Sequence, residues 1–244
     1  MGRTAVAVAA TLVGLAFAMS VFERWLLRRR PQDLAWSFSL LLFAVAGAAL
    51  TVGAGVGWDG PTFRVFYLFG AILNVPFLAI GTVYLLAGRR AGDRTALGVS
   101  LAGAFAVGVV VTAPFRAAIP ADRLVQGSAV FGVLPRVLAG VASAGGALVI
   151  LAGAVWSMVR RRGVLSNGLI AGGTLMLGAS GVFNSVFDAM SAFAVSLLVG
   201  ITLIFGGFVL ATSGGSSGAP RALSAGPAAA ASPSPTNAEA DRRT

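Results

Sequence analysis

Long apolar segments separated by short polar stretches dominate the pattern of this chain. Each segment is close to the ~20 residues that a helix needs to cross the ~30 Å hydrocarbon core of a bilayer. The pattern predicts seven spanning helices, at about 4–22, 34–56, 63–87, 96–117, 134–159, 166–187 and 190–212, with ends placed to within ~2–4 residues. We therefore expect an all-α, polytopic membrane protein whose residues 1–212 form one seven-helix transmembrane domain.

Arginine clusters follow the first, third and fifth apolar segments. They comprise Arg24 with Arg28, Arg29 and Arg30, then Arg89, Arg90 and Arg94, and finally Arg160, Arg161 and Arg162. Because loops rich in arginine stay in the cytoplasm, we expect the N-terminus outside and the C-terminus inside. Ala16-Phe17-Ala18 resembles a signal-peptide cleavage site, but the arginines that follow resist translocation, so we expect the first segment to remain as a helix.

The stretch after the last apolar segment, residues 213–244, has a different composition. It is rich in serine, glycine, proline and alanine and lacks the large apolar side chains that build a core. We expect it to form a disordered cytoplasmic tail.

Composition narrows the possible functions. The chain is 57% hydrophobic and only 11% charged, and it contains neither cysteine nor histidine. Disulfides, the usual zinc sites and catalysis by cysteine or histidine are thereby excluded. All 18 basic residues are arginine, so no lysine is present to form a retinal Schiff base. We expect no enzyme activity, cofactor or metal, and because the arginines cluster between apolar spans, we expect the lipid bilayer as partner and no nucleic acid.

The third segment contains three residues that are unfavourable in hydrocarbon. It reads FRVFYLFGAILNVPF from Phe63 to Phe77 and includes Arg64, Asn74 and Pro76. Asn74 lies ~15 Å along the helix from Arg64, near the bilayer middle, where an amide needs a hydrogen-bond partner. Pro76 removes a hydrogen bond to the carbonyl of residue 72 and should bend the helix there, leaving a carbonyl for another group to satisfy.

Polar side chains also gather at the predicted outer ends of several segments. The candidate ligand-binding residues are Arg64, Tyr67, Asn74, Arg116, Arg136, Asn184 and Asp188. Arg64, Tyr67 and Asn74 share one face of the third helix, and Asn184 and Asp188 form an i, i+4 pair on the sixth. If these faces meet, they form an outward-facing polar pocket for a small anionic or lipid-like ligand. In the alternative, the arginines extend to the lipid headgroups and the amides only bond neighbouring helices.

Two short motifs have simpler explanations than function. Gly178-Ala179-Ser180-Gly181 matches the GxSG of rhomboid proteases, but the histidine base of that family is absent, so we interpret it as helix packing. Pro31, next to Gln32, is expected to begin the second helix, where its missing N–H is harmless. An internal repeat, with Arg64-Val65 recurring as Arg136-Val137, and a chance match are both open interpretations.

The stretches "RRRPQDLAWSFSLLLF" (Arg28 to Phe43) and "FRVFYLFGAILNVPFLAIGTVYLLAGRR" (Phe63 to Arg90) resemble uncharacterised seven-helix integral membrane proteins of high-GC actinobacteria. The resemblance covers about a quarter of the chain, implies a bacterial plasma membrane and supplies no activity. We expect a non-enzymatic membrane protein that binds or transports a ligand. A structural or accessory subunit without a ligand is the alternative.

Overall fold

The computed structural model describes residues 2–159, 164–187 and 190–213, and every element within these ranges is helical. The elements are α1 (Gly2–Arg28), α2 (Pro31–Gly55), α3 (Gly60–Phe66), the π-helix η1 (Tyr67–Leu73), α4 (Asn74–Thr112), α5 (Gly127–Val130), α6 (Val133–Val159), α7 (Val164–Phe187) and α8 (Met190–Ser213). Four described stretches are long and apolar enough to cross a membrane: Thr4–Arg28, Pro31–Gly55, Gly60–Thr112 and Val133–Val159. The all-helical fold class is confirmed. The predicted tail lies outside the described residues, apart from Ser213.

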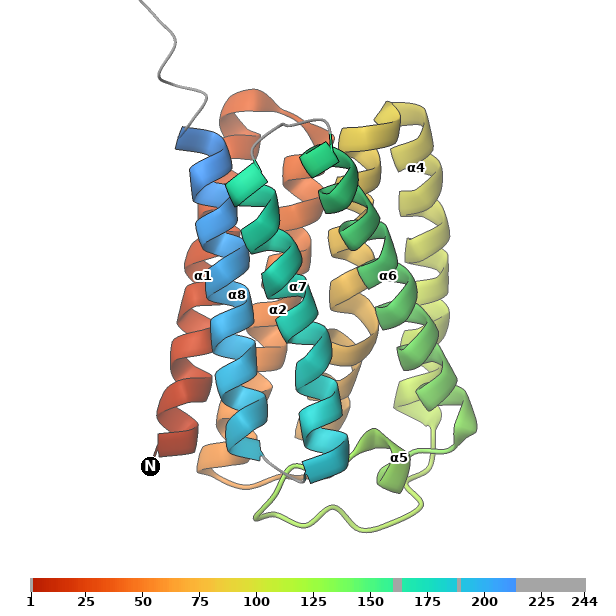
Figure 1. Cartoon of the computed structure of the whole chain (residues 1–244). Helices are drawn as coiled ribbons and strands as arrows, with labels where there is room; N and C mark the ends of the chain where they lie inside the picture. The colour runs from red at the N-terminus through yellow and green to blue at the C-terminus, as the bar shows by residue number, and fades with distance from the viewer. Residues whose placement is uncertain (1, 160–163, 188–189, 214–244) are drawn as a thin grey trace, which may run out of the picture.

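Two antiparallel legs make up the stretch Gly60–Thr112, because the chain reverses at Gly88 (Figure 1). A straight helix of this length would extend ~80 Å, far more than a bilayer core. Gly88 has φ 80° and ψ 179°, a backbone conformation that is available almost only to glycine. Residues on either side of it meet: the Tyr84 hydroxyl lies 2.7 Å from Asp93 Oδ1. We call residues 60–87 the first leg and residues 89–112 the second leg.

A closed ring of helices surrounds the centre of the bundle. α1 packs on α2, α2 on α4, α4 on α6, α6 on α7, α7 on α8, and α8 returns to α1 (Figure 1). The first leg provides the α4 part of this ring, since a Cβ on Gly81 would overlap Trp36 of α2 and one on Gly146 of α6 would lie 2.9 Å from the Val75 carbonyl. The ring therefore has no room for larger residues at these helix crossings.

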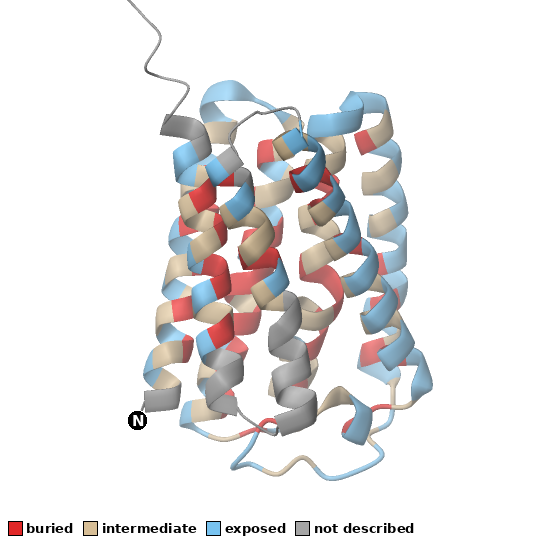
Figure 2. Ribbon diagram, viewed as in Figure 1, coloured by how far each residue is buried: buried red, intermediate tan, exposed pale blue. Residues whose placement is uncertain are grey.

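The interior contains two apolar clusters, and buried residues lie on the inner sides of the helices while exposed residues cover their outer sides (Figure 2). Near α5, aromatic rings pack closely, with Phe63 and Phe131 having centroids 5.8 Å apart. The other cluster joins α1, α2 and α8 through Phe17, Phe43 and Ile204. Large apolar side chains such as Leu101, 64% exposed, face outward. A protein with apolar side chains on both its inside and its outside is suited to a hydrocarbon environment.

A buried ion pair fixes the junction of α1 and α2. Arg24 donates a hydrogen bond to Asp33, 3.1 Å away, and the Asp33 side chain is 0% exposed. The Arg24 guanidinium also lies 4.5 Å from the centre of the Phe208 ring on α8. Pro31 occupies the first turn of α2, which confirms the role predicted for it. The sequence places Arg24 in a basic cluster and does not indicate that it pairs with Asp33.

We predict that Gly88→Ala lowers the free energy of unfolding by about 1–3 kcal/mol, because a side chain strains the backbone at this conformation. The matched control is Gly98→Ala in the second leg, where an added Cβ meets nothing within 4 Å. That change should be neutral or raise stability by up to ~1 kcal/mol, since Gly98 lies in a regular helix. Denaturation in mixed micelles measures both, and equal effects would contradict a reversal at Gly88.

Candidate functional site

The first leg changes its hydrogen-bonding register just before Pro76. Residues Tyr67–Leu73 form a π-helix, and the N–H of Asn74 bonds to the carbonyl of Phe69, five residues earlier. Pro76, which has no N–H, is the third residue of α4, and about one turn before it lies the carbonyl of Ala71. The Ser143 hydroxyl of α6 donates to this carbonyl at 2.6 Å. The sequence therefore located the disturbance correctly, and a donor from a neighbouring helix binds the carbonyl of Ala71, next to residue 72 where the open carbonyl was predicted.

Asn74 finds its partner on α2. Ser39 Oγ lies 2.8 Å from the backbone oxygen of Asn74 and 2.9 Å from its side-chain oxygen position. Because a hydroxyl has one hydrogen, both contacts are satisfied when the serine donates to the backbone carbonyl and the amide nitrogen faces Oγ. An amide at this depth does therefore bond a neighbouring helix, as predicted.

Arg64 closes the end of the second leg. Its guanidinium donates to the carbonyl of Val110 and, at 2.8 Å, to that of Ala113, and it lies 4.2 Å from the centre of the Phe115 ring. Helix α4 ends at Thr112, so the Val110 carbonyl lies in its last turn and the Ala113 carbonyl just beyond it, and neither has an N–H partner further along the helix. In this structure Arg64 thus acts as a helix cap, a role that neither interpretation of the sequence included.

A cavity of about 620 Å³ occupies the centre of the ring. Its described lining comes from α1, α2, the first leg, the α5 region, α6, α7 and α8, and no residue of the second leg contributes. Among the candidate residues, Tyr67, Asn74 and Arg136 line it, whereas Arg64 and Arg116 do not. The side chain of Asn184 and the whole of Asp188 lie outside the described part of the chain.

The cavity is polar at one end and apolar further in. Near α5 it is lined by Gln126, Ser128, Tyr67 and Arg136, and the Tyr67 hydroxyl lies 3.4 Å from the carbonyl of Pro135. Arg136 is exposed and forms no ion pair with any described carboxylate. Its guanidinium can therefore bind an anion, preferably through two parallel hydrogen bonds to a carboxylate or phosphate.

The deeper part offers room and little hydrogen-bonding capacity. Along α6 the lining runs from Arg136 to Ile150, ~21 Å of helix, and passes Gly140 and Ala147, whose small size leaves space. Thr174 of α7 uses its hydroxyl on the carbonyl of residue 170 in its own helix. Among the described residues, no group of histidine, cysteine or acidic side chains could hold a metal ion. The described lining thus offers one cation, Arg136, a few polar groups at the mouth and a mostly apolar interior.

Sequence reasoning predicted Tyr67 and Arg136 at the mouth but missed Gln126 and Ser128, and it missed the serines Ser39 and Ser143. Gln126 and Ser128 lie between apolar segments, where nothing in their spacing relates them to the third helix. The two serines lie inside apolar segments, where nothing in the sequence identifies their partners. The sequence gives one indication of such a partner: Pro76 lacks an N–H, so a carbonyl of the preceding turn needs a donor from elsewhere. The sequence does not indicate which helix provides that donor.

We predict that Ser143→Ala destabilises the protein by about 0.6–1.7 kcal/mol, the range for interhelical hydrogen bonds in membranes, because the Ala71 carbonyl loses its donor. Ser100→Ala on the exposed surface of the second leg is the matched control and should be neutral. Unfolding in mixed micelles measures both changes. A neutral Ser143→Ala would show that the contact contributes nothing to holding α6 on the first leg.

The chain was also compared with known proteins. No protein-family model, no curated protein and no solved structure matches it.

Proposed function

We propose that this protein is a multi-pass protein of the bacterial plasma membrane with seven spans, its N-terminus outside and its C-terminus in the cytoplasm. The reversal at Gly88 supports counting the two legs of Gly60–Thr112 as separate spans. The reversal within α4 and the link between α1 and α2 lie at one end of the bundle, opposite α5 (Figure 1). That link contains Arg29 and Arg30, and the reversal is followed in sequence by Arg89 and Arg90. Arginine-rich loops at one end favour that end as the cytoplasmic one.

Within this architecture, we infer that the central cavity binds one anionic, lipid-like molecule with a single hydrocarbon chain. The observation that supports this is a cavity of about 620 Å³ whose mouth carries Arg136, which pairs with no described carboxylate, and whose deeper lining is mostly apolar. A guanidinium favours a carboxylate or phosphate group, and an apolar cavity favours hydrocarbon. A small hydrophilic anion would use the mouth and leave the interior empty.

The geometry orients such a ligand. Its charged group lies beside Arg136 and the Tyr67 hydroxyl, and its chain extends inward past Gly140 and Ala147. The proposed role is binding without chemistry, because the chain has no histidine or cysteine and no carboxylate among the described lining residues. Binding is a step common to transport and to sensing, and the proposal covers both.

The accessory-subunit alternative is favoured by a different observation. Arg64, Asn74 and Ser143 all form hydrogen bonds to groups of neighbouring helices. Many of the polar side chains inside the bundle therefore hold the helices together. If the protein is an accessory subunit, the cavity shows no saturable ligand binding.

The test is a binding measurement on the purified protein in nanodiscs, with lysophosphatidate as the anionic probe and lysophosphatidylcholine of the same chain length as the zwitterionic one. We expect saturable binding that prefers lysophosphatidate. Arg136→Gln should weaken lysophosphatidate binding about tenfold, corresponding to ~1.4 kcal/mol, because the charged group loses its cation. Arg116→Gln, an exposed arginine outside the cavity, should leave it unchanged.

A second pair of variants tests the interior. Ala147→Phe fills the cavity and should weaken both probes, whereas Ala144→Phe, on the exposed side of the same helix, should weaken neither. Absence of saturable binding, or an Arg136→Gln protein that binds lysophosphatidate like the parent, would overturn the proposal in favour of the accessory role.

A further inference from the structure

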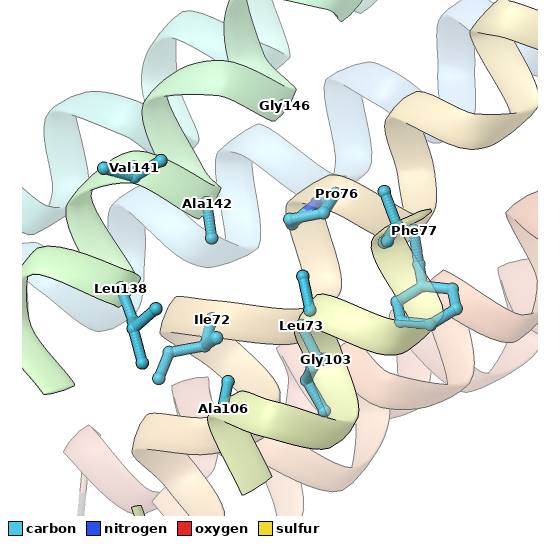
Figure 3. Close-up of a pocket in the computed structure, with 12 residues that line it drawn as sticks. Ile72, Leu73, Pro76, Phe77, Gly103, Ala106, Leu138, Val141, Ala142 and Gly146 are labelled. Atoms are coloured by element: carbon cyan, nitrogen blue, oxygen red, sulfur yellow. The ribbon is translucent and has the colours of Figure 1, made fainter. Parts of the chain in front are cut away.

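A second hollow lies on the other side of the first leg. It has a volume of about 270 Å³ and is lined by the two legs and by α6. Figure 3 shows Leu73 of η1, Gly103 of the second leg and Ala142 of α6 around the same space. All of its described lining residues are apolar or glycine, in contrast to the central cavity. We call this hollow the crevice.

The crevice opens onto the outer apolar surface. The first leg forms its floor, and Ala102 of the second leg and Val141 of α6 form its rims, with Val141 69% exposed. Leu101 and Phe105, next to the rim, are 64% and 58% exposed. The mouth is therefore continuous with a surface suited to contact lipid chains.

The depth of the crevice also fits a lipid chain. Ala142 lies ~14 Å along α6 from Val133, and Gly103 lies ~14 Å along the second leg from Thr112. Both values place the crevice near the middle of a ~30 Å core, on the side closer to α5. The end of an acyl chain from the lipid leaflet on the α5 side reaches this depth.

We propose that the crevice binds one acyl chain of a bilayer phospholipid. An empty apolar hollow loses the dispersion contacts of its walls, and water does not fill a site that lacks polar partners. The described walls provide no partner for a headgroup, so only hydrocarbon enters and the polar part of the lipid stays at the membrane surface. This site requires the crevice to face the bilayer and does not depend on a ligand in the central cavity.

The inserted chain contacts the irregular part of the first leg. Leu73 and Pro76, on the crevice side, lie where the π-helix ends and the proline interrupts the hydrogen bonding. Asn74 and Val75, between them in sequence, line the central cavity on the opposite face. The acyl chain therefore packs against the back of the wall that bounds the central cavity.

The experiment uses the full chain in proteoliposomes containing a phosphatidylcholine with a photoactivatable diazirine near the end of one acyl chain. After illumination, mass spectrometry identifies the labelled residues. We expect labelling of Ile72 and Leu73, because these side chains are only 3% and 8% exposed and a lipid chain reaches them through the crevice.

Two variants make the test specific. Ala102→Phe blocks the rim and should reduce labelling of Ile72 and Leu73 several-fold, whereas Ala104→Phe, exposed on the same leg and outside the crevice, should not change it. Labelling confined to exposed residues such as Leu101 and Phe105 in the parent protein overturns the proposal without need of a variant. Labelling of Ile72 that persists in a folded Ala102→Phe protein overturns it as well.

Discussion

A carbonyl without a partner inside an apolar bundle is the constraint on which the rest of this structure depends. Pro76 has no N–H to donate to the preceding turn, and a polar group left open there needs a partner. The helix has π geometry from Tyr67 to Leu73, and the Ser143 hydroxyl donates to the carbonyl of Ala71, about one turn before the proline. With Ser39 bonded to Asn74 on the other side, the same short segment joins the first leg to both α2 and α6.

These contacts determine where space is left. The first leg presents Tyr67, Ala71 and Asn74 to the central cavity and Leu73 and Pro76 to the crevice. Gly146 closes the wall between the two spaces, because α6 approaches the Val75 carbonyl so closely that a Cβ there would lie at 2.9 Å. One irregular helix segment, held by two hydroxyl groups, thus separates a polar-mouthed cavity from a wholly apolar crevice.

The sequence predicted features that depend on local composition. Apolar length located the helices, and the incompatibility of proline and asparagine with a regular membrane helix located the disturbed segment. It did not predict features that depend on contacts distant in sequence. Arg64 binds carbonyls at the end of the second leg, Arg24 pairs with Asp33 across a turn, and Ser143 of α6 donates to the Ala71 carbonyl. Predicting each of these contacts requires knowing which helices are neighbours. Apolar periodicity in a membrane sequence does not identify the neighbours of a helix.

The proposed function requires the cavity inside the ring to be open to water at the end beside α5, the proposed outer side. Cysteine labelling of intact cells tests this most directly because the native chain has no cysteine. Gly140→Cys places a thiol in the cavity, ~10 Å along α6 from Val133, where an added Cβ meets nothing within 4 Å. Ala104→Cys places one at a similar depth on the outward surface of the second leg. Because thiols react as thiolates in water, a membrane-impermeant maleimide should label Gly140→Cys and leave Ala104→Cys unlabelled. Equal labelling of the two, or none at Gly140→Cys in a folded protein, would contradict the account.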